Sequence, residues 1–364
     1  MSALSQIFTS CPDIQQGLDT AWQTGAMIGA DDRMPLLQFM TSDVNRQGVT
    51  QLISPGGGKV RNVQLTYMQR LTEDQVQANQ SNPNCGQGED QGDLSTTYTL
   101  DTGENLQTKG FTIDGDMLEA VCRDNGVLFQ QLIQRDMDVL RRAVATEIAE
   151  QVAALAGGWA MAYFETGNSV GNVNASDEYV WRTIVSGEHD KQAWTKLWNA
   201  LTDSGMGNNP LIIGGTTGRE YFQLSQSGCC ANDGLDVGSL FTRFGYAFAH
   251  DARLQKALGA GTYANGANKA MAILPGALQL VTYNRSSWKA NIPIPADGAN
   301  YHHVAVADPM AGLVYDWTLQ DNCGVITSNL TWTGKTIALP NDMFATGDPY
   351  EGVTGVAKIT ITNS

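Results

Sequence analysis

The clearest periodic pattern in the chain is helical and lies between residues 116 and 156. Apolar residues recur there every three or four positions, which places them on one face of a helix. Asp136 interrupts this stripe, and Gly157 follows it as a normal helix end. The apolar positions are Leu128, Leu132, Leu140, Val144, Ile148, Val152 and Leu155. The pattern predicts one long amphipathic helix over 116–156.

The charged residues of this helix alternate in sign at helical spacing. Three arginines have acidic side chains as neighbours along the helix, an arrangement typical of a solvated face with surface ion pairs. These residues are Arg135, Arg141 and Arg142, with Asp136, Asp138, Glu147 and Glu150. We therefore expect this face to lie in solvent.

Before the helix, the pattern has a period of two. Val63, Leu65 and Tyr67 alternate with polar residues, and the run 95–113 is rich in Thr and aromatic residues. Both features are typical of β-strands. The residues between the two runs are polar, acidic and rich in Gly and Asn, so few of them can enter a core. The pattern predicts a two-stranded hairpin over 58–113, which needs another subunit to pack on because a lone hairpin is marginal in water.

The first 57 residues form a segment of a different kind. Their apolar residues are sparse and irregular, and the segment ends in the structure-breaking run Ser54-Pro55-Gly56-Gly57-Gly58. We expect an arm that is largely extended over other parts of the assembly.

The second half of the chain mixes helices and strands. The patterns predict helices over 190–202 and 217–226, a buried strand over 210–214, and a tail rich in strands. The tail strands are expected at 304–307, 313–319, 324–332, 336–339 and 357–362. Taken together, the elements predict an α+β fold.

Composition narrows the possible functions. The 364 residues suggest two or three folded units, or one elaborate domain. The net charge of −15 and the absence of a basic run argue against binding to a phosphate backbone or to an anionic membrane. No apolar run is long enough for a transmembrane helix and no signal peptide is visible. The six cysteines form no CxxC pair, which favours reduced thiols in a cytoplasm.

Charged residues make up only 16% of the chain, against about 25% in an average soluble protein. Gly, Asn, Gln, Ser and Thr replace them, giving a polar but uncharged surface. Because interface cores are depleted in charge, this composition favours extensive contact with other protein.

Candidate catalytic motifs are weak throughout. Gly167-Asn168-Ser169-Val170-Gly171 matches the nucleophile-elbow spacing, but no helix start follows it. Gly334-Lys335-Thr336 lacks the first glycine of a phosphate-binding loop and sits in a strand pattern. His250-Asp251 could form a general-base dyad, yet a structural histidine is the better interpretation, and His302 and His303 point to opposite faces of a strand. We expect no cofactor, no metal and no enzymatic activity; a serine hydrolase using Ser169 with His250 is the alternative.

The order and proportions of these elements resemble the major capsid proteins of tailed bacteriophages, with their Hong Kong 97-like fold. Two short sequence segments in the central part of the chain, residues 210–215 and 270–277, are also similar to sequences of that family. The resemblance implies an N-terminal arm, a long β-hairpin called the E-loop, a spine helix in a peripheral domain and an α/β axial domain. The implied ranges are 1–57 for the arm, 58–113 for the E-loop hairpin, 114–190 for the peripheral domain with its spine helix at 116–156, 191–340 for the axial domain plus returning strands, and 341–364 for a C-terminal strand of the peripheral domain.

The resemblance also implies a function. Subunits would self-assemble into pentamers and hexamers of an icosahedral shell in the host cytoplasm, enclosing double-stranded DNA without sequence-specific binding. A portal and a decoration protein are possible partners, and scaffolding would come from a separate protein, since no scaffolding segment is visible. Subunit contacts are expected at the hairpin tip, at Asn84, Glu89, Asp90 and Asp93. Nothing places an Asn or Glu beside Lys59 or Lys109, so the cross-linking chemistry of some members is not carried over. An encapsulin-like compartment for protein cargo is the alternative with the same fold.

Overall fold

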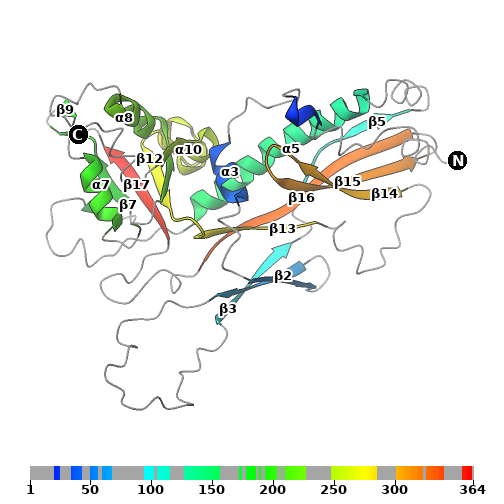
Figure 1. Ribbon diagram of the computed structural model, residues 1–364, viewed down its shortest axis with the longest axis horizontal. Helices are drawn as coiled ribbons and strands as arrows, with labels where there is room; N and C mark the ends of the chain where they lie inside the picture. The colour runs from blue at the N-terminus through cyan, green and yellow to red at the C-terminus, as the bar shows by residue number, and fades with distance from the viewer. Residues whose placement is uncertain are drawn as a thin grey trace, which may run out of the picture.

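The computed structural model combines one long helix, several short helices and three main sheets (Figure 1). The α+β class that the sequence predicts is confirmed. The residues that the structure describes are 20–24, 34–42, 50–55, 60–67, 94–101, 105–114, 127–155, 172–173, 178–185, 188–189, 193–202, 206, 210–226, 247–284, 301–322, 325–339 and 355–362.

Helix α5 (Val127–Ala154) is the backbone of the body and runs diagonally across it (Figure 1). Its 28 residues extend for about 42 Å at 1.5 Å per residue. The predicted apolar stripe is buried at Leu140, Val144, Ile148 and Val152. The end of the helix agrees with the prediction, whereas residues 116–126, the predicted first turns, lie outside the described residues.

An antiparallel sheet packs against α5 in the order β13-β16-β15-β14. Strand β16 is central, and the short strands β4 and β5 also pair with it. The strands are β4 (Leu106–Gln107), β5 (Phe111–Ile113), β13 (Leu278–Tyr283), β14 (Tyr301–Asp308), β15 (Leu313–Asn322) and β16 (Val325–Ala338). Four of the predicted tail strands are confirmed here, with 324–332 and 336–339 joined in the single strand β16, and the fifth, at 357–362, lies in the next sheet as β17 (Val356–Thr362).

A second sheet has six strands in the order β11-β10-β12-β17-β7-β6. The pairs β10–β11 and β17–β7 are parallel, and the other pairs are antiparallel. The strands are β6 (Asn172–Val173), β7 (Glu178–Arg182), β10 (Leu211–Gly214), β11 (Ala247–His250), β12 (Lys269–Ile273) and β17 (Val356–Thr362). Strands from the ranges expected for the peripheral domain, β7 and β17, thus share a sheet with strands from the expected axial range. The domain boundaries themselves stay predictions.

Short helices accompany this second sheet. They are α7 (Ala193–Leu201), α8 (Thr216–Gln226), α10 (Ala252–Leu258) and the 3-10 turn η4 (Ala264–Gly266), and a small pair is formed by β8 (Ile184–Val185) and β9 (Glu188–His189). The helices predicted over 190–202 and 217–226 correspond to α7 and α8. α8 begins at Thr216, one residue earlier than predicted.

The third sheet, of three strands, projects from the body (Figure 1). It consists of β1 (Thr50–Pro55), β2 (Val60–Tyr67) and β3 (Leu94–Asp101), all antiparallel. The prediction of a two-stranded hairpin was therefore incomplete, because residues 50–55 of the expected arm form a third strand. The glycines at 56–58, which were expected to end the arm, follow β1 in the sequence and lie outside the described residues.

The arm is not extended at residues 35–41, where the prediction was wrong. Helix α3 (Pro35–Thr41) begins with a proline at its first position and packs against α5 and β13. Leu36, Leu37 and Met40 are at most 2% exposed and belong to the main core. A helix of seven residues is too short to form alone in water, so the apolar slot that receives it is what makes it helical.

Candidate functional site at the root of the projecting sheet

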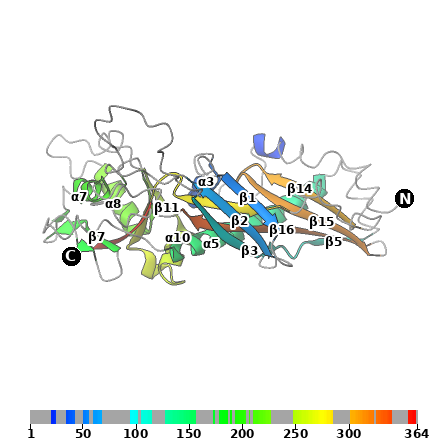
Figure 2. The ribbon, with the colours of Figure 1, turned by 90° about the horizontal axis from the view of Figure 1, so that it is seen from below.

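The projecting sheet is attached to the body through its own small apolar cluster. Six buried residues form this cluster, separate from the main core: Val63, Leu65, Leu100, Val281, Ile337 and Leu339. Three come from β2 and β3, two from β13 and β16, and Leu339 follows β16. Figure 2 shows the three strands lying across β16. The sheet is therefore anchored independently of the core that stabilises the rest of the chain.

Two further contacts hold the projecting sheet in a defined orientation. The hydroxyl of Tyr98 donates a hydrogen bond to the carbonyl of Ala338 at 3.2 Å. The guanidinium of Arg61 lies 5.4 Å from the centre of the Tyr283 ring, a cation–π contact. Both contacts join the projecting sheet to β13 or β16 at the side of the apolar cluster, so they fix the angle at which the sheet leaves the body.

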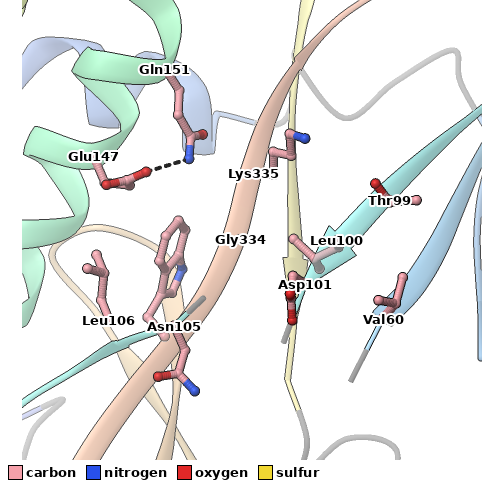
Figure 3. A pocket seen from close by; sticks show the side chains of 11 residues that line it. Val60, Thr99, Leu100, Asp101, Asn105, Leu106, Glu147, Gln151, Gly334 and Lys335 are labelled. Atoms are coloured by element: carbon pink, nitrogen blue, oxygen red, sulfur yellow. Dashed lines mark hydrogen bonds between the residues drawn. The ribbon is translucent and has the colours of Figure 1, made fainter. Parts of the chain in front are cut away.

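An open cleft of about 630 Å³ lies beside this root (Figure 3). Its walls come from helix α5 and from strands β2, β3, β4 and β16. The lining residues are Val60, Thr99, Leu100, Asp101, Asn105, Leu106, Glu147, Gln151, Trp332, Gly334 and Lys335. The described lining contains no His, Cys or Ser, and its two acidic side chains outnumber its one lysine. It therefore offers neither a nucleophile with a base nor a cationic site for an anion.

Gln151 fastens the long helix to the central strand at this cleft. Its Nε2 donates to Oε1 of Glu147 at 2.9 Å, and its Oε1 accepts from the backbone N–H of Thr336 at 2.7 Å. Thr336, Gly334 and Lys335 lie inside β16, as the strand pattern predicts, and form no phosphate-binding loop. The rejection of that motif is confirmed.

A buried ionic network joins α5 to the turn between β14 and β15. Nε of Arg141 donates to Oδ2 of Asp308 at 2.6 Å, and its Nη2 lies 3.3 Å from the other oxygen of Asp308. Nη1 of Arg141 lies 3.4 Å from Oδ1 of Asp138, which is also paired with Arg142. The hydroxyl of Tyr315 donates to Asp308 at 3.2 Å. Burial, aided by the Asp308 charge, raises the pKa of Tyr315 well above its ordinary value, so this hydroxyl stays a donor.

This network corrects the prediction of a solvated salt-bridged face. The side chain of Arg141 is 2% exposed and that of Asp308 is 0% exposed, whereas Arg142 is 50% exposed and matches the prediction. Sequence analysis missed Asp308 altogether. The only available signal was its place at the end of a strand, before the turn that its carboxylate closes by accepting from the N–H of Met310.

The histidine and aspartate candidates have structural partners. Asp251 caps helix α10 by accepting from the N–H groups of Arg253 and Leu254, and Nε2 of His250 lies 3.1 Å from Oε1 of Gln255. The two side chains thus have separate partners and do not form the general-base dyad. His303 lies 3.6 Å from Asp316 and is buried, in agreement with a structural role.

The remaining candidates concern residues whose positions are not described. Ser169 and the hairpin-tip residues Asn84, Glu89, Asp90 and Asp93 lie outside the described residues, so their roles stay predictions. Within the part of the chain that the structure describes, no three metal-ligating side chains gather at one place. None of the described helices has the length and apolar character needed to cross a bilayer.

The chain is similar to solved structures of bacteriophage capsids. Its fold matches the capsid of cyanophage A-1(L) with a TM-score of 0.43 and 11% identity, over 84% of this chain and 90% of that one. The capsid of Ralstonia phage GP4 matches with a TM-score of 0.35 and 10% identity, over 84% and 85%. The capsid of Myoviridae phage XM1 matches with 0.34 and 8%, over 87% and 88%. No protein-family model and no curated protein matches the sequence.

Proposed function

We propose that this chain is a structural subunit that assembles with copies of itself into a closed shell, as the major capsid protein of a tailed bacteriophage does. The observation that carries the proposal is the projecting sheet, which lies outside the main core and is held by six buried residues. Such a projection contributes little to the stability of its own subunit. Its role is explained if it packs on a neighbouring one.

The body has the rigidity that a shell subunit requires. Helix α5, the central strand β16 and the β14–β15 turn are locked together by Gln151, Arg141 and Asp308. A shell transmits load through its subunits, and a long helix fixed at several points resists bending. The charge-poor composition supports the same conclusion, because large interfaces between copies of a chain with net charge −15 require uncharged surfaces.

The finer features of the proposal follow from the resemblance. Subunits form pentamers and hexamers of an icosahedral shell around double-stranded DNA, assembled in the host cytoplasm and retained in the virion. A separate scaffolding protein, a portal and possible decoration proteins complete the particle. The acidic balance suits a container wall that does not bind the DNA it encloses. The role is structural, without catalysis.

The test removes the hairpin tip. Deletion of residues 74–92 is expected to leave a folded subunit, with unchanged circular dichroism, that no longer forms shells in negative-stain microscopy. The intact chain, expressed with its scaffolding protein, should form closed shells or capsomers. An intact chain that stays a 39.2 kDa monomer under all assembly conditions overturns the proposal. Normal shells from the deletion variant overturn the assignment of the tip.

Two alternatives give different results. An encapsulin-like compartment would yield particles that contain protein cargo and no nucleic acid, which the absorbance ratio of purified particles at 260 and 280 nm distinguishes. A serine hydrolase would react with a fluorophosphonate probe and lose the label in Ser169→Ala. His250 is paired with Gln255 and does not form a general-base dyad with Asp251, so we expect no labelling of Ser169.

A further inference from the structure

The turn that follows helix α10 contains the dipeptide Asn265-Gly266. Asparagine loses its amide most readily before glycine, because the glycine nitrogen can reach the side-chain carbonyl without hindrance from a Cβ. The side chain of Asn265 is exposed, so water has access to it. The second Asn-Gly of the sequence, Asn125-Gly126, lies outside the described residues. Asn265 is therefore a candidate site of covalent modification.

The reaction at such a site needs water and no catalyst. The backbone nitrogen of Gly266 bonds to Cγ of Asn265 and gives up its proton, while the bond from Cγ to Nδ2 breaks and ammonia leaves. Water then opens the cyclic imide, which leaves either aspartate or isoaspartate at position 265. Both products carry a new negative charge. Isoaspartate also lengthens the backbone by one carbon atom.

The folded turn holds the attacking nitrogen in the wrong direction for this reaction. Residues Ala264–Gly266 form the 3-10 turn η4, in which the N–H of Gly266 donates to the carbonyl of Tyr263 at 3.3 Å. This nitrogen is thus directed along the axis of the turn and away from Cγ of the preceding residue. For the attack, Asn265 must leave the helical conformation and Gly266 must give up its hydrogen bond.

Helix α10 keeps this turn closed. Nε2 of the buried Gln255 donates to the same carbonyl of Tyr263 at 2.9 Å. Gly266 lies so close to α10 that a Cβ there would be 1.7 Å from the carbonyl oxygen of Gln255. Glycine is therefore required at position 266 by packing, and the reactive dipeptide is a consequence of that requirement.

We infer that Asn265 is a deamidation site, at which the closed turn suppresses the reaction and local opening of the turn permits it. The change is irreversible, because the longer backbone of isoaspartate displaces Gly266 from its place against Gln255. The carbonyl of Ala267 accepts from the N–H of Thr217 at 3.0 Å, in the first turn of α8. Displacement of the turn therefore also releases the beginning of α8.

Peptide mapping of the full-length subunit measures the reaction. The protein is incubated at mildly alkaline pH, native or in guanidinium chloride, and the tryptic peptide 257–269 is followed by mass spectrometry. Deamidation of Asn265 is expected to be about tenfold or more slower in the native protein, because it must await local opening. Asn268, exposed in the same peptide but followed by lysine, is the internal control and should react slowly in both states. Equal rates at Asn265 in the two states overturn the inference.

Gln255→Ala opens the turn without touching the reacting residues. The loss of its hydrogen bond to Tyr263 should raise the native deamidation rate about fivefold. Gln223→Ala, the same substitution at an exposed position, should leave the rate unchanged. Hydrogen exchange of α5 shows whether the subunit stays folded. An unchanged rate in a folded Gln255→Ala subunit overturns the inference.

A measurement on the wild type covers the case in which Gln255→Ala does not fold. At low denaturant concentrations, deamidation of Asn265 should rise together with hydrogen exchange of residues 263–267, before α5 loses its protection. A rise that occurs only when α5 also loses protection overturns the role of local opening.

Protein aged until Asn265 is converted tests the effect on α8. Hydrogen exchange in the first turn of α8 should be about tenfold faster than in fresh protein, because the contact between Thr217 and Ala267 is lost. Asn265→Asp adds the charge without lengthening the backbone, so it should exchange as the fresh protein does. Equal exchange in aged and fresh protein overturns the release of α8.

Discussion

Arg141 on helix α5 and Asp308 at the end of β14 form a buried ion pair across 167 residues of sequence, with 2.6 Å between Nε and Oδ2. Two guanidinium nitrogens contact the two carboxylate oxygens, the geometry that gives arginine its advantage over lysine. The pair closes the β14–β15 turn against the helix. It is therefore a fixed joint between two parts of the body that are distant in the chain.

Removing one partner of this pair should destabilise the subunit strongly. Arg141→Ala leaves the Asp308 carboxylate buried without its cation, and the expected loss in the free energy of unfolding is about 3–5 kcal/mol. Arg141→Lys should recover only part of this loss, since an ammonium group cannot contact both oxygens in the same way. Denaturant unfolding of dispersed subunits, followed by circular dichroism, measures both.

Arg142→Ala is the control for that experiment. Arg142 is adjacent in sequence and also contacts Asp138, but its side chain is half exposed. A pair in solvent is worth about 0–1 kcal/mol, so this variant should unfold nearly as the wild type does. Equal losses in the Arg141 and Arg142 variants would contradict the assignment of a buried joint.

Helix α5 could be predicted from the sequence, whereas the burial of one of its charged side chains could not. The helix could be predicted because all the residues of its apolar stripe lie in one stretch. The burial of Arg141 could not, because its sequence neighbours suggest ordinary surface pairs and Asp308 comes from the other end of the chain. The cleft at the sheet root is a similar case, since its walls come from five elements that are separate in the sequence.

The expected N-terminal arm shows a second limit of prediction from the sequence. Helix α3 was missed because seven residues carry too little periodic signal and too little intrinsic helix stability. Its formation depends on a slot between α5 and β13, which no local pattern reveals. Asp251, 215 residues away, also accepts from the N–H of Leu36 at 3.4 Å, so even the first turn of α3 depends on a distant side chain.

Asp136 should make the stability of the subunit depend on pH. It interrupts the apolar stripe of α5, is buried, and its Oδ2 has no hydrogen-bond partner. Burial raises the pKa of Asp136, although the neighbouring Arg135 lowers it in part. Because the folded state holds this proton more tightly than the unfolded state, ionised Asp136 destabilises the fold above its folded pKa. The penalty disappears as the pH falls toward the ordinary aspartate value.

Asp136→Leu tests this prediction. The variant should be more stable than the wild type by about 1–2 kcal/mol at pH 7, because a well-packed apolar side chain replaces a buried carboxylate. The gain should shrink at pH 4, where the wild-type carboxyl takes up its proton. Thermal unfolding of both proteins at the two pH values gives the comparison. A gain that is the same at both would show that the Asp136 charge is not responsible.

Alanine substitutions at Gly110 and Gly261 separate the cost of backbone strain from the cost of steric overlap. Both have positive φ, 68° and 86°. A Cβ at Gly110 would lie 1.7 Å from the carbonyl oxygen of Ser328, whereas a Cβ at Gly261 would have no neighbour within 4 Å. Gly261→Ala should therefore cost about 1 kcal/mol from strain alone. Gly110→Ala should cost about 3 kcal/mol or more, because β5 must also move away from β16.

Denaturant unfolding of the two alanine variants measures this difference. Gly110→Ala should also expose the region of β5 to faster hydrogen exchange, which Gly261→Ala should not. Similar losses of stability in the two variants would mean that the chain near residue 110 can move away from Ser328 without loss.

Ala260 occupies a position where glycine should be better. Helix α10 ends in a Schellman motif, in which the N–H of Ala260 donates to Ala257 and the N–H of Gly261 donates to Lys256, at 3.1 and 2.9 Å. This motif puts Ala260 at φ 53°, the left-handed region that disfavours a side chain. Ala260→Gly should therefore stabilise the subunit by about 0.5–1 kcal/mol, the strain relieved being partly offset by the flexibility that glycine adds to the unfolded chain.

The melting temperature of the dispersed subunit measures this gain, and Ala257→Gly is its control. Ala257 lies inside the same helix, so glycine there should lower the stability by about 1 kcal/mol. The two substitutions are chemically identical and three residues apart, and they should shift the melting temperature in opposite directions. A decrease in both variants would show that the backbone at residue 260 is not held in the left-handed conformation in solution.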